Sequence, residues 1–191
     1  MLFTKPSALL LTVLAPTILA SPNPSPRITG YTISGPGCPN DSNSVRASSG
    51  NLGDTATFTF SQLRGDDTEN CQVHVTSTGG SQGWQFAVKE VSYQANVQLK
   101  SGSQLDTFTT VYFSENADAT TVFKSSIACA GPELKDTVTV RQSTNNLTWS
   151  KCIGSDGYPG ILNVNARPVI NGNGGSFDFK STTWKLEWRK C

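Results

Sequence analysis

The chain closes on the stretch Thr182-Thr183-Trp184-Lys185-Leu186-Glu187-Trp188-Arg189-Lys190-Cys191. Its apolar residues Trp184, Leu186 and Trp188 alternate with charged ones, which is the period of a strand with one face in a core and the other in water. The last residue is a cysteine, so a disulfide to an earlier cysteine can fix this strand covalently. We therefore expect a core strand that is anchored at its end.

The same alternation recurs upstream in segments that turn residues separate. In residues 55–60, Ala56, Phe58 and Phe60 alternate with threonines. Further segments of strand type cover residues 71–76, 84–88, 91–99, 106–113, 120–123, 136–141, 146–152, 161–167 and 177–180. No window shows a sustained helical period. The sequence thus predicts an all-β protein, an antiparallel, jelly-roll-like β-sandwich of about nine or ten short strands, stabilised by disulfides.

The apolar phase changes within the region of residues 84–99. Trp84, Phe86 and Val88 occupy even positions, whereas the apolar residues from Val91 onward occupy odd ones. One extra residue in a strand moves every later side chain to the other face. The shift across residues 89–90 therefore predicts a β-bulge.

The N-terminus has the composition of a secretory signal peptide. Lys5 precedes a short apolar run that ends at Ala20, whereas a membrane span needs about 20 apolar residues. We expect cleavage after Ala20, which leaves residues 21–27 as a proline-rich extended leader and residues 28–191 as a single β-sandwich domain. No later stretch is apolar enough to cross a bilayer, so the sequence predicts a secreted, extracellular protein.

Charge and composition argue against several partners. The chain has 15 Lys and Arg and 14 Asp and Glu, and loss of Lys5 with the signal leaves the mature protein neutral. Only 15% of the residues are charged, and they form no basic block. Nucleic acid and anionic membranes are therefore not expected as partners. We expect a monomer.

The five cysteines lie far apart and form no Cys-x-x-Cys pair: Cys38, Cys71, Cys129, Cys152 and Cys191. In an oxidising compartment their default state is disulfide-bonded, and each choice of the odd cysteine leaves three pairings of the others. We favour Cys38 with Cys71 and Cys152 with Cys191, each closing a loop of about 30 to 40 residues and contributing roughly 3 to 4 kcal/mol. Cys129 is then the free thiol, and the other arrangements stay open.

Two Asn-x-Ser/Thr sequons, at Asn40 and Asn146, fit an exported glycoprotein. A third, at Asn23, is blocked by the proline that follows it. If glycans are attached at Asn40 and Asn146, both residues must lie on the surface.

Several short motifs follow one another along the chain: Gly37-Cys38-Pro39, Asn70-Cys71-Gln72, Gly83-Trp84-Gln85-Phe86-Ala87-Val88, Trp149-Ser150-Lys151-Cys152, Leu162-Asn163-Val164-Asn165 and Leu186-Glu187-Trp188-Arg189-Lys190-Cys191. In these motifs the chain resembles a family of small secreted proteins, mostly fungal, known as domain of unknown function family 4360. The resemblance implies a secreted, disulfide-stabilised β domain of a fungus and brings no catalytic residues. Four of the five cysteines match the family pattern, and Cys129 looks like an addition.

Residues suited to catalysis are few. His74 is the single histidine and lies on the polar face of a strand-like segment, and the chain has no Gly-x-Ser-x-Gly elbow, so we interpret His74 as a hydrogen-bonded surface residue. Glu90, at the expected bulge, is the best candidate for a glycosidase acid, with Glu187 or Asp178 as the second carboxylate. Glu187, however, alternates with tryptophans between two basic residues, a pattern typical of a surface ion pair.

Asp66, Asp67 and Glu69 place several oxygen atoms in one polar loop, and such ligands suit calcium. Their spacing departs from the known calcium-loop pattern, and a single histidine cannot build a histidine metal centre. We expect no metal and no cofactor.

Four aromatic residues fall near loops or strand ends: Tyr31, Trp84, Trp149 and Tyr158. Exposed rings stack on sugars through their apolar faces. Tyr158 lies in a loop rich in glycine and proline, where burial is not expected. We take Tyr31, Trp149 and Tyr158 as candidate binding residues, while most tryptophans should belong to the core.

Together these features predict a secreted, non-catalytic protein that binds an extracellular partner. The partner is either a cell-wall polysaccharide or a host protein, and in the second case the chain is an effector that serves virulence, an inference by analogy. Two alternatives stay open. One is a carbohydrate-active hydrolase or lyase that uses Glu90 with a second carboxylate, and the other is a structural cell-wall protein.

Overall fold

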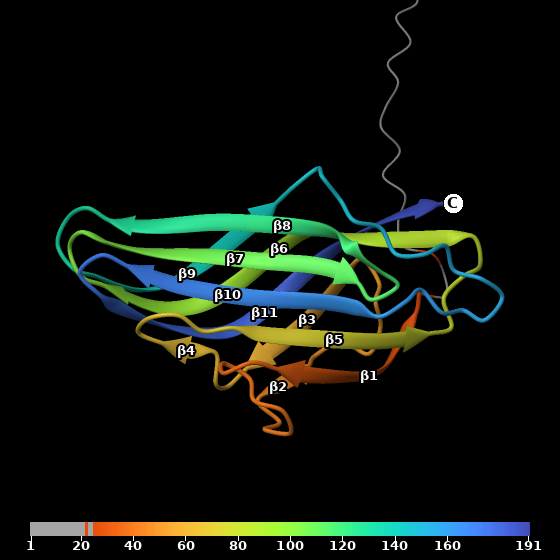
Figure 1. Ribbon diagram of the computed structural model, residues 1–191, viewed down its shortest axis with the longest axis horizontal. Coiled ribbons are helices and arrows are strands. Elements are labelled where there is room, and N and C mark those ends of the chain that lie inside the picture. Colours follow the sequence, from red (N-terminus) through yellow and green to blue (C-terminus); the bar gives the residue numbers. More distant parts are fainter. Residues whose placement is uncertain (1–21, 23–24) are drawn as a thin grey trace, which may run out of the picture.

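The computed structural model describes Pro22 and residues 25–191, and this part of the chain folds into two antiparallel sheets packed face to face (Figure 1). The predicted signal peptide, residues 1–20, lies outside the described residues. The strands are β1 (Arg27–Ser34), β2 (Val45–Ala47), β3 (Thr55–Phe60), β4 (Arg64–Gly65), β5 (Cys71–Thr78), β6 (Trp84–Leu99), β7 (Ser103–Phe113), β8 (Asn116–Cys129), β9 (Leu134–Ser143), β10 (Leu162–Asn171) and β11 (Gly175–Lys190).

The five-stranded sheet has the order β1-β5-β10-β7-β8, and the six-stranded sheet has the order β2-β3-β11-β6-β9, with β4 also paired to β11. In Figure 1 the strands of the five-stranded sheet run side by side across the view, and those of the other sheet cross them at an angle. The predicted all-β antiparallel sandwich is confirmed. No helix that is long and apolar enough to cross a membrane occurs among the described residues.

The strands are more numerous and longer than predicted. The described part of the chain forms eleven, and β6 and β11 each span 16 residues. Segments that looked separate in sequence, such as residues 177–180 and the closing stretch, are one strand with an irregularity after Phe179. Residues 146–152 were predicted as a strand but do not form one. They lie beside the start of β6 and make single backbone hydrogen bonds to it, such as that from Ser150 N to the Phe86 carbonyl at 2.8 Å.

Inward-facing residues of both sheets form one core, and the two tryptophans of the closing strand lie in it as predicted. Trp184 and Trp188 are 1% and 2% exposed. Their ring centroids lie 4.5 Å from that of Phe58 and 4.9 Å from that of Phe86, respectively. The Trp188 Nε1 donates to the Gly53 carbonyl at 2.8 Å. The Nε1 of Trp184 finds no partner among the described residues, so packing must offset a desolvation cost of about 1 to 3 kcal/mol.

The predicted bulge lies at Lys89. On the neighbouring strand, Lys185 pairs with Glu90 and Leu186 pairs with Val88, so Lys89 is the extra residue. This insertion lets the residues on both sides of it keep their apolar side chains in the core, since Val88 and Val91 are both buried.

Two disulfides join the cysteines in the pairing favoured above. Cys38 and Cys71 connect the loop after β1 to the start of β5, and Cys152 holds Cys191, the residue after β11, with Cα atoms 6.0 Å apart. Cys129 is free and buried, and its thiol donates to the Pro132 carbonyl at 3.0 Å. The end of the closing strand is therefore anchored covalently.

We expect the double substitution Cys152→Ser/Cys191→Ser to lower the free energy of unfolding by about 3 to 4 kcal/mol, because it releases a loop with a sequence separation of 39 residues. Urea unfolding without reductant measures this change. The control is Cys129→Ala, which removes a buried thiol but no cross-link and should cost about 1 kcal/mol. A double variant no less stable than this control would contradict a stabilising role for the disulfide.

Candidate functional site

The outward-facing side chains of each sheet form a broad surface, and these two surfaces differ in chemistry. Charged pairs dominate the six-stranded sheet: Lys89 contacts Glu187, Lys180 contacts Asp178, and the Arg141 Nε lies 3.3 Å from Glu90. On the five-stranded sheet the central outward-facing side chains are mainly amides, hydroxyls and aromatic rings. Each surface is considered in turn.

Glu90 and Glu187, the candidate catalytic carboxylates, both lie on the six-stranded sheet and are paired with basic residues. A depression of about 290 Å³ beside Glu90 is lined by Lys89, Glu90, Ser143, Thr144, Asn145 and Lys185. Glu90 is the one carboxylate in that lining. A glycosidase needs two carboxyl groups facing each other across a cleft, and this depression supplies one carboxylate with basic neighbours.

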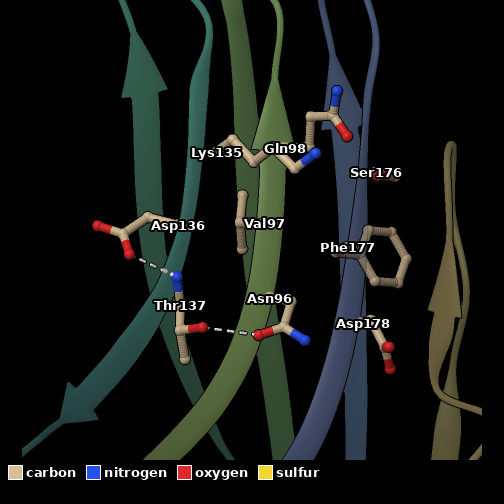
Figure 2. Close-up of a pocket in the computed structure, with 9 residues that line it drawn as sticks. All are labelled: Asn96, Val97, Gln98, Lys135, Asp136, Thr137, Ser176, Phe177 and Asp178. Carbon is tan, nitrogen blue, oxygen red and sulfur yellow. Dashed lines mark hydrogen bonds between the residues drawn. The ribbon is translucent and has the colours of Figure 1, made fainter.

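Figure 2 shows a second groove on the same sheet, of about 460 Å³, that crosses β9, β6 and β11. Polar groups fill it: the Thr137 hydroxyl donates to the Asn96 Oδ1 at 2.8 Å, and Asp178 is paired with Lys180. Its apolar lining residues Val97 and Phe177 are each only 2% exposed. The groove therefore offers hydrogen bonds to a ligand but no exposed ring.

The five-stranded sheet carries what we call the Tyr112 cluster, formed by the outward-facing side chains of three adjacent strands: Gln72 and His74 of β5, Asn163 and Asn165 of β10, and Tyr112 of β7. The register places His74, Asn163 and Tyr112 opposite one another, and places Gln72 opposite Asn165. The alternation of buried and outward residues in β5 and β7 fixes these positions.

Tyr112 reaches across β10. The Gln72 Nε2 donates to the Tyr112 hydroxyl at 2.6 Å, although β10 separates their strands. Strands two positions apart in a sheet are about 10 Å apart, so both side chains must lean over β10 to meet. Asn163 is 0% exposed in spite of its outward position, as expected beneath such a bridge. The Tyr112 ring is thereby held as a platform on the sheet.

His74 and Asn163 form a second fixed contact. The amide nitrogen of Asn163 donates to the Ser114 Oγ at 2.9 Å and the Ile161 carbonyl at 3.1 Å, and its Oδ1 faces the His74 Nδ1. The Nδ1 of a neutral His74 therefore carries the proton, which leaves Nε2 as an acceptor. The nearby Asn165 Oδ1 is buried and has no partner among the described residues.

Two hollows adjoin His74 along the edge strand β1. One, of about 410 Å³, is lined by Gly30, Tyr31, Thr32, His74, Thr76, Ser114 and Ile161. The other, of about 470 Å³, is lined by Tyr31, Thr32, Ile33, Ser34, Asn40, Asp41, Asn43, Val45 and His74. The structure thus brings Tyr31 and Asn40 together with His74. Tyr31 is half-buried, and its hydroxyl donates to the Val45 carbonyl at 3.0 Å.

The loop that carries Asn40 has an unusual backbone. Asp41 and Asn43 have φ values of 61° and 52°, the two positive values of non-glycine residues in the described part of the chain. Asp and Asn tolerate this conformation better than other residues, but it still costs energy. The adjacent Cys38–Cys71 disulfide ties this loop to β5.

The other sequence candidates lie apart from this cluster. Tyr158 is half-buried, because its hydroxyl donates to the Glu115 Oε1 at 2.7 Å and the Lys151 ammonium lies 4.4 Å from its ring centroid. The Arg189 guanidinium lies 3.8 Å from the ring centroid of Trp149. A basic side chain of the protein therefore already lies against each of these rings, where a sugar would have to stack.

Asp66, Asp67 and Glu69 do not assemble a metal site. Within the described residues no group of three His, Cys, Asp or Glu side chains is placed to hold a metal ion. The sequon residues Asn40 and Asn146 are both exposed, as glycan attachment requires.

The sequence could have indicated part of the Tyr112 cluster. Asn163 and Asn165 alternate with the buried Leu162 and Val164, and that pattern marks amides on an outer face. Tyr112 carries no such signal, because its strand has aromatic residues on both faces and the sequence alone does not say which one faces outward.

The fold and this site define a disulfide-bonded β-sandwich with an amide-rich and aromatic outer surface. The chain belongs to the family described as Domain of unknown function (DUF4360), whose family model matches residues 24–191. No curated protein matches the chain.

Solved structures with a similar arrangement include carbohydrate-binding modules. A non-crystalline cellulose specific module of family 28 has a TM-score of 0.34 and 8% identity, covering 84% of this chain and 87% of its own. The family 11 module of Clostridium thermocellum, in complex with a β-1,3-1,4-mixed-linked tetrasaccharide, has a TM-score of 0.27 and 11% identity, with coverages of 82% and 84%. A family 61 module with β-1,4-galactotriose has values of 0.25 and 10%, with coverages of 88% and 96%. Similarities this low carry no argument about what the chain binds.

We expect the phenol of Tyr158 to titrate late. Burial, together with the hydrogen bond and charge of Glu115, raises its pKa from 10.0 to about 12. The unfolded chain releases this proton near pH 10, whereas the folded protein holds it, so stability should fall as the pH rises from 10 towards 12. Tyrosinate absorbance during a pH titration measures the pKa, and Glu115→Gln should move it back towards 10. An unchanged high-pH component in Tyr158→Phe would assign the titration to another tyrosine.

Proposed function

We propose that this chain is a secreted, non-catalytic polysaccharide-binding protein whose ligand lies on the outer face of the five-stranded sheet. One observation carries the proposal: the Tyr112 ring is held over β10 by Gln72, among amide and hydroxyl side chains. A ring that is fixed in place before binding loses little side-chain entropy when a ligand docks.

The chemistry of the Tyr112 cluster matches that of a sugar chain. The apolar face of a pyranose stacks on an aromatic ring, while its hydroxyls need donors and acceptors of hydrogen bonds. Two hydroxyl side chains lie next to Tyr112: Thr110 on the same strand and Thr120 opposite it on β8. Val122 of β8, opposite Thr110, is 47% exposed. An open sheet of this kind suits an extended polymer better than a small ligand, which binding proteins usually enclose.

Binding is favoured over catalysis by the state of the candidate acids. Glu90 and Glu187 lie on the six-stranded sheet, on the surface opposite the Tyr112 cluster, and each contacts a basic side chain there. The hydrolase or lyase alternative requires a second carboxylate within reach of Glu90 across a cleft. The depression beside Glu90 provides basic and hydroxyl groups instead.

Secretion is part of the proposal. The apolar N-terminal run, the two disulfides and the exposed sequon residues Asn40 and Asn146 support an oxidising, extracellular location. A fungal origin is also part of the proposal, and the resemblance to a mostly fungal family supports it. A host-protein ligand, which would make the chain an effector, and a structural role in the cell wall remain the alternatives that the binding test separates.

We expect Tyr112→Ala to weaken polysaccharide binding about tenfold, because it removes the stacking platform and its bond to Gln72. Affinity electrophoresis and calorimetry with β-glucan, xylan, chitin oligomers and homogalacturonan measure the change. The matched control is Tyr158→Ala, which removes a half-buried tyrosine away from the cluster and should leave affinity unchanged.

The thermal transition of both variants shows whether they are folded. A loss of binding in Tyr158→Ala and not in Tyr112→Ala would move the site to the loop of residues 154–160. If the wild-type protein is retained on none of these polysaccharides, the proposal is wrong, and the host-protein and structural alternatives remain.

A further inference from the structure

The five-stranded sheet carries a second aromatic position on the strand of Tyr112. Phe108 is also an outward-facing residue of β7, four residues before Tyr112, with Thr110 between them. At about 3.4 Å per residue the Cα atoms of these two residues are roughly 14 Å apart along the strand. A polymer that stacks on Tyr112 and follows β7 therefore reaches Phe108.

Two cations flank Phe108. The register places Arg167 of β10 opposite Phe108 on one side and Lys124 of β8 opposite it on the other. The Lys124 Nζ lies 5.7 Å from the Phe108 ring centroid, and both basic residues are exposed. The backbones of Arg167 and Lys124 are about 10 Å apart, because one strand lies between theirs. The two basic residues thus lie on either side of the Phe108 ring.

Neither cation is neutralised by a neighbour. Among the carboxylates that the structure describes, none forms an ion pair with Arg167 or Lys124. On the opposite surface Lys89, Arg141 and Lys180 are paired, while Lys135 and Lys185 are not paired with any described carboxylate. The carboxylate next along the sheet, Asp106, is engaged otherwise. Its Oδ1 accepts from the Gln104 Nε2 at 2.7 Å and from Ser126, and its Oδ2 accepts from the Asn171 Nδ2 at 2.7 Å.

We propose that the polysaccharide is acidic: a polyuronate that runs along β7, stacks on Tyr112 and Phe108, and presents carboxylates to Arg167 and Lys124. This rests on the proposed function. A planar guanidinium binds a carboxylate through two parallel hydrogen bonds, and an ammonium adds a point charge. The acid beside them on the sheet, Asp106, is held by Gln104, Ser126 and Asn171, so it does not pair with either cation, and both cations can bind such a ligand.

The test compares two forms of one polymer. Homogalacturonan with free carboxylates and the same chain fully methyl-esterified share one sugar backbone, and the ester replaces each negative charge with a neutral methyl ester. We expect the wild-type protein to bind the acid form at least about tenfold more tightly at low salt, since hydrogen bonds to charged groups contribute more than neutral ones. Added salt should weaken binding of the acid form and leave the ester form unchanged.

Variants locate the charge effect. Arg167→Gln/Lys124→Gln should reduce affinity for the acid form to that for the ester and leave ester binding unchanged, whereas Tyr112→Ala should weaken both. The control is Lys135→Gln, which removes an outward lysine that lines the groove of Figure 2 on the opposite surface and should change neither affinity.

The outcomes separate the two proposals. Equal binding of acid and ester by the wild-type protein, or binding of neutral glucans alone, overturns the acidic ligand and leaves the binding function standing. A loss of acid binding in Lys135→Gln as large as that in the double variant also overturns it. Failure to bind any polysaccharide, acidic or neutral, removes both proposals.

Discussion

Trp184 and Trp188 of β11 pack against Phe58 of β3 and Phe86 of β6, and the order of the six-stranded sheet depends on this contact. The last strand of the chain lies between two strands from its first half, so the sheet cannot be completed before the C-terminus is in place. Strands paired over such long sequence separations form slowly, because their loops must close first. The disulfide from Cys152 to Cys191 fixes this late contact covalently.

A core built in this way also determines what the outer surfaces present. Because side chains alternate in β7, burying Val111 and Phe113 forces Tyr112 outward. The same constraint in β10 turns Asn163 and Asn165 away from the core while Leu162 and Val164 fill it. The positions of the Tyr112 cluster are therefore consequences of core packing. The identities of its more exposed side chains, such as Tyr112 and Gln72, are not determined by that packing, since other residues that tolerate a strand would satisfy the fold at those positions.

This difference explains how far the sequence alone could lead. Alternation and turn residues sufficed for the sandwich, the bulge at Lys89 and the buried tryptophans, because each leaves a local pattern. Strand order and register depend on residues far apart in the sequence. The contact of His74 with Asn163 and the hydrogen bond of Gln72 to Tyr112 therefore produce no local sequence pattern from which they could be predicted. For the same reason the sequence predicted a hydrogen-bonded His74 but not its partner, and it did not reveal that Arg189 and Lys151 lie against the rings of Trp149 and Tyr158.

The cations beside Phe108 have no carboxylate partner among the described residues, and the energies show why the fold permits this. An exposed ion pair contributes about 0 to 1 kcal/mol, so pairing Lys89 or Arg141 stabilises the sandwich little, and leaving Arg167 and Lys124 unpaired costs it equally little. A hydrogen bond from a cation to a ligand carboxylate, shielded by the ligand from water, contributes about 1.5 to 3 kcal/mol. Unpaired cations beside Phe108 would therefore matter little to folding and much to recognition of the proposed acidic chain, because the ligand would supply a partner that is shielded from water.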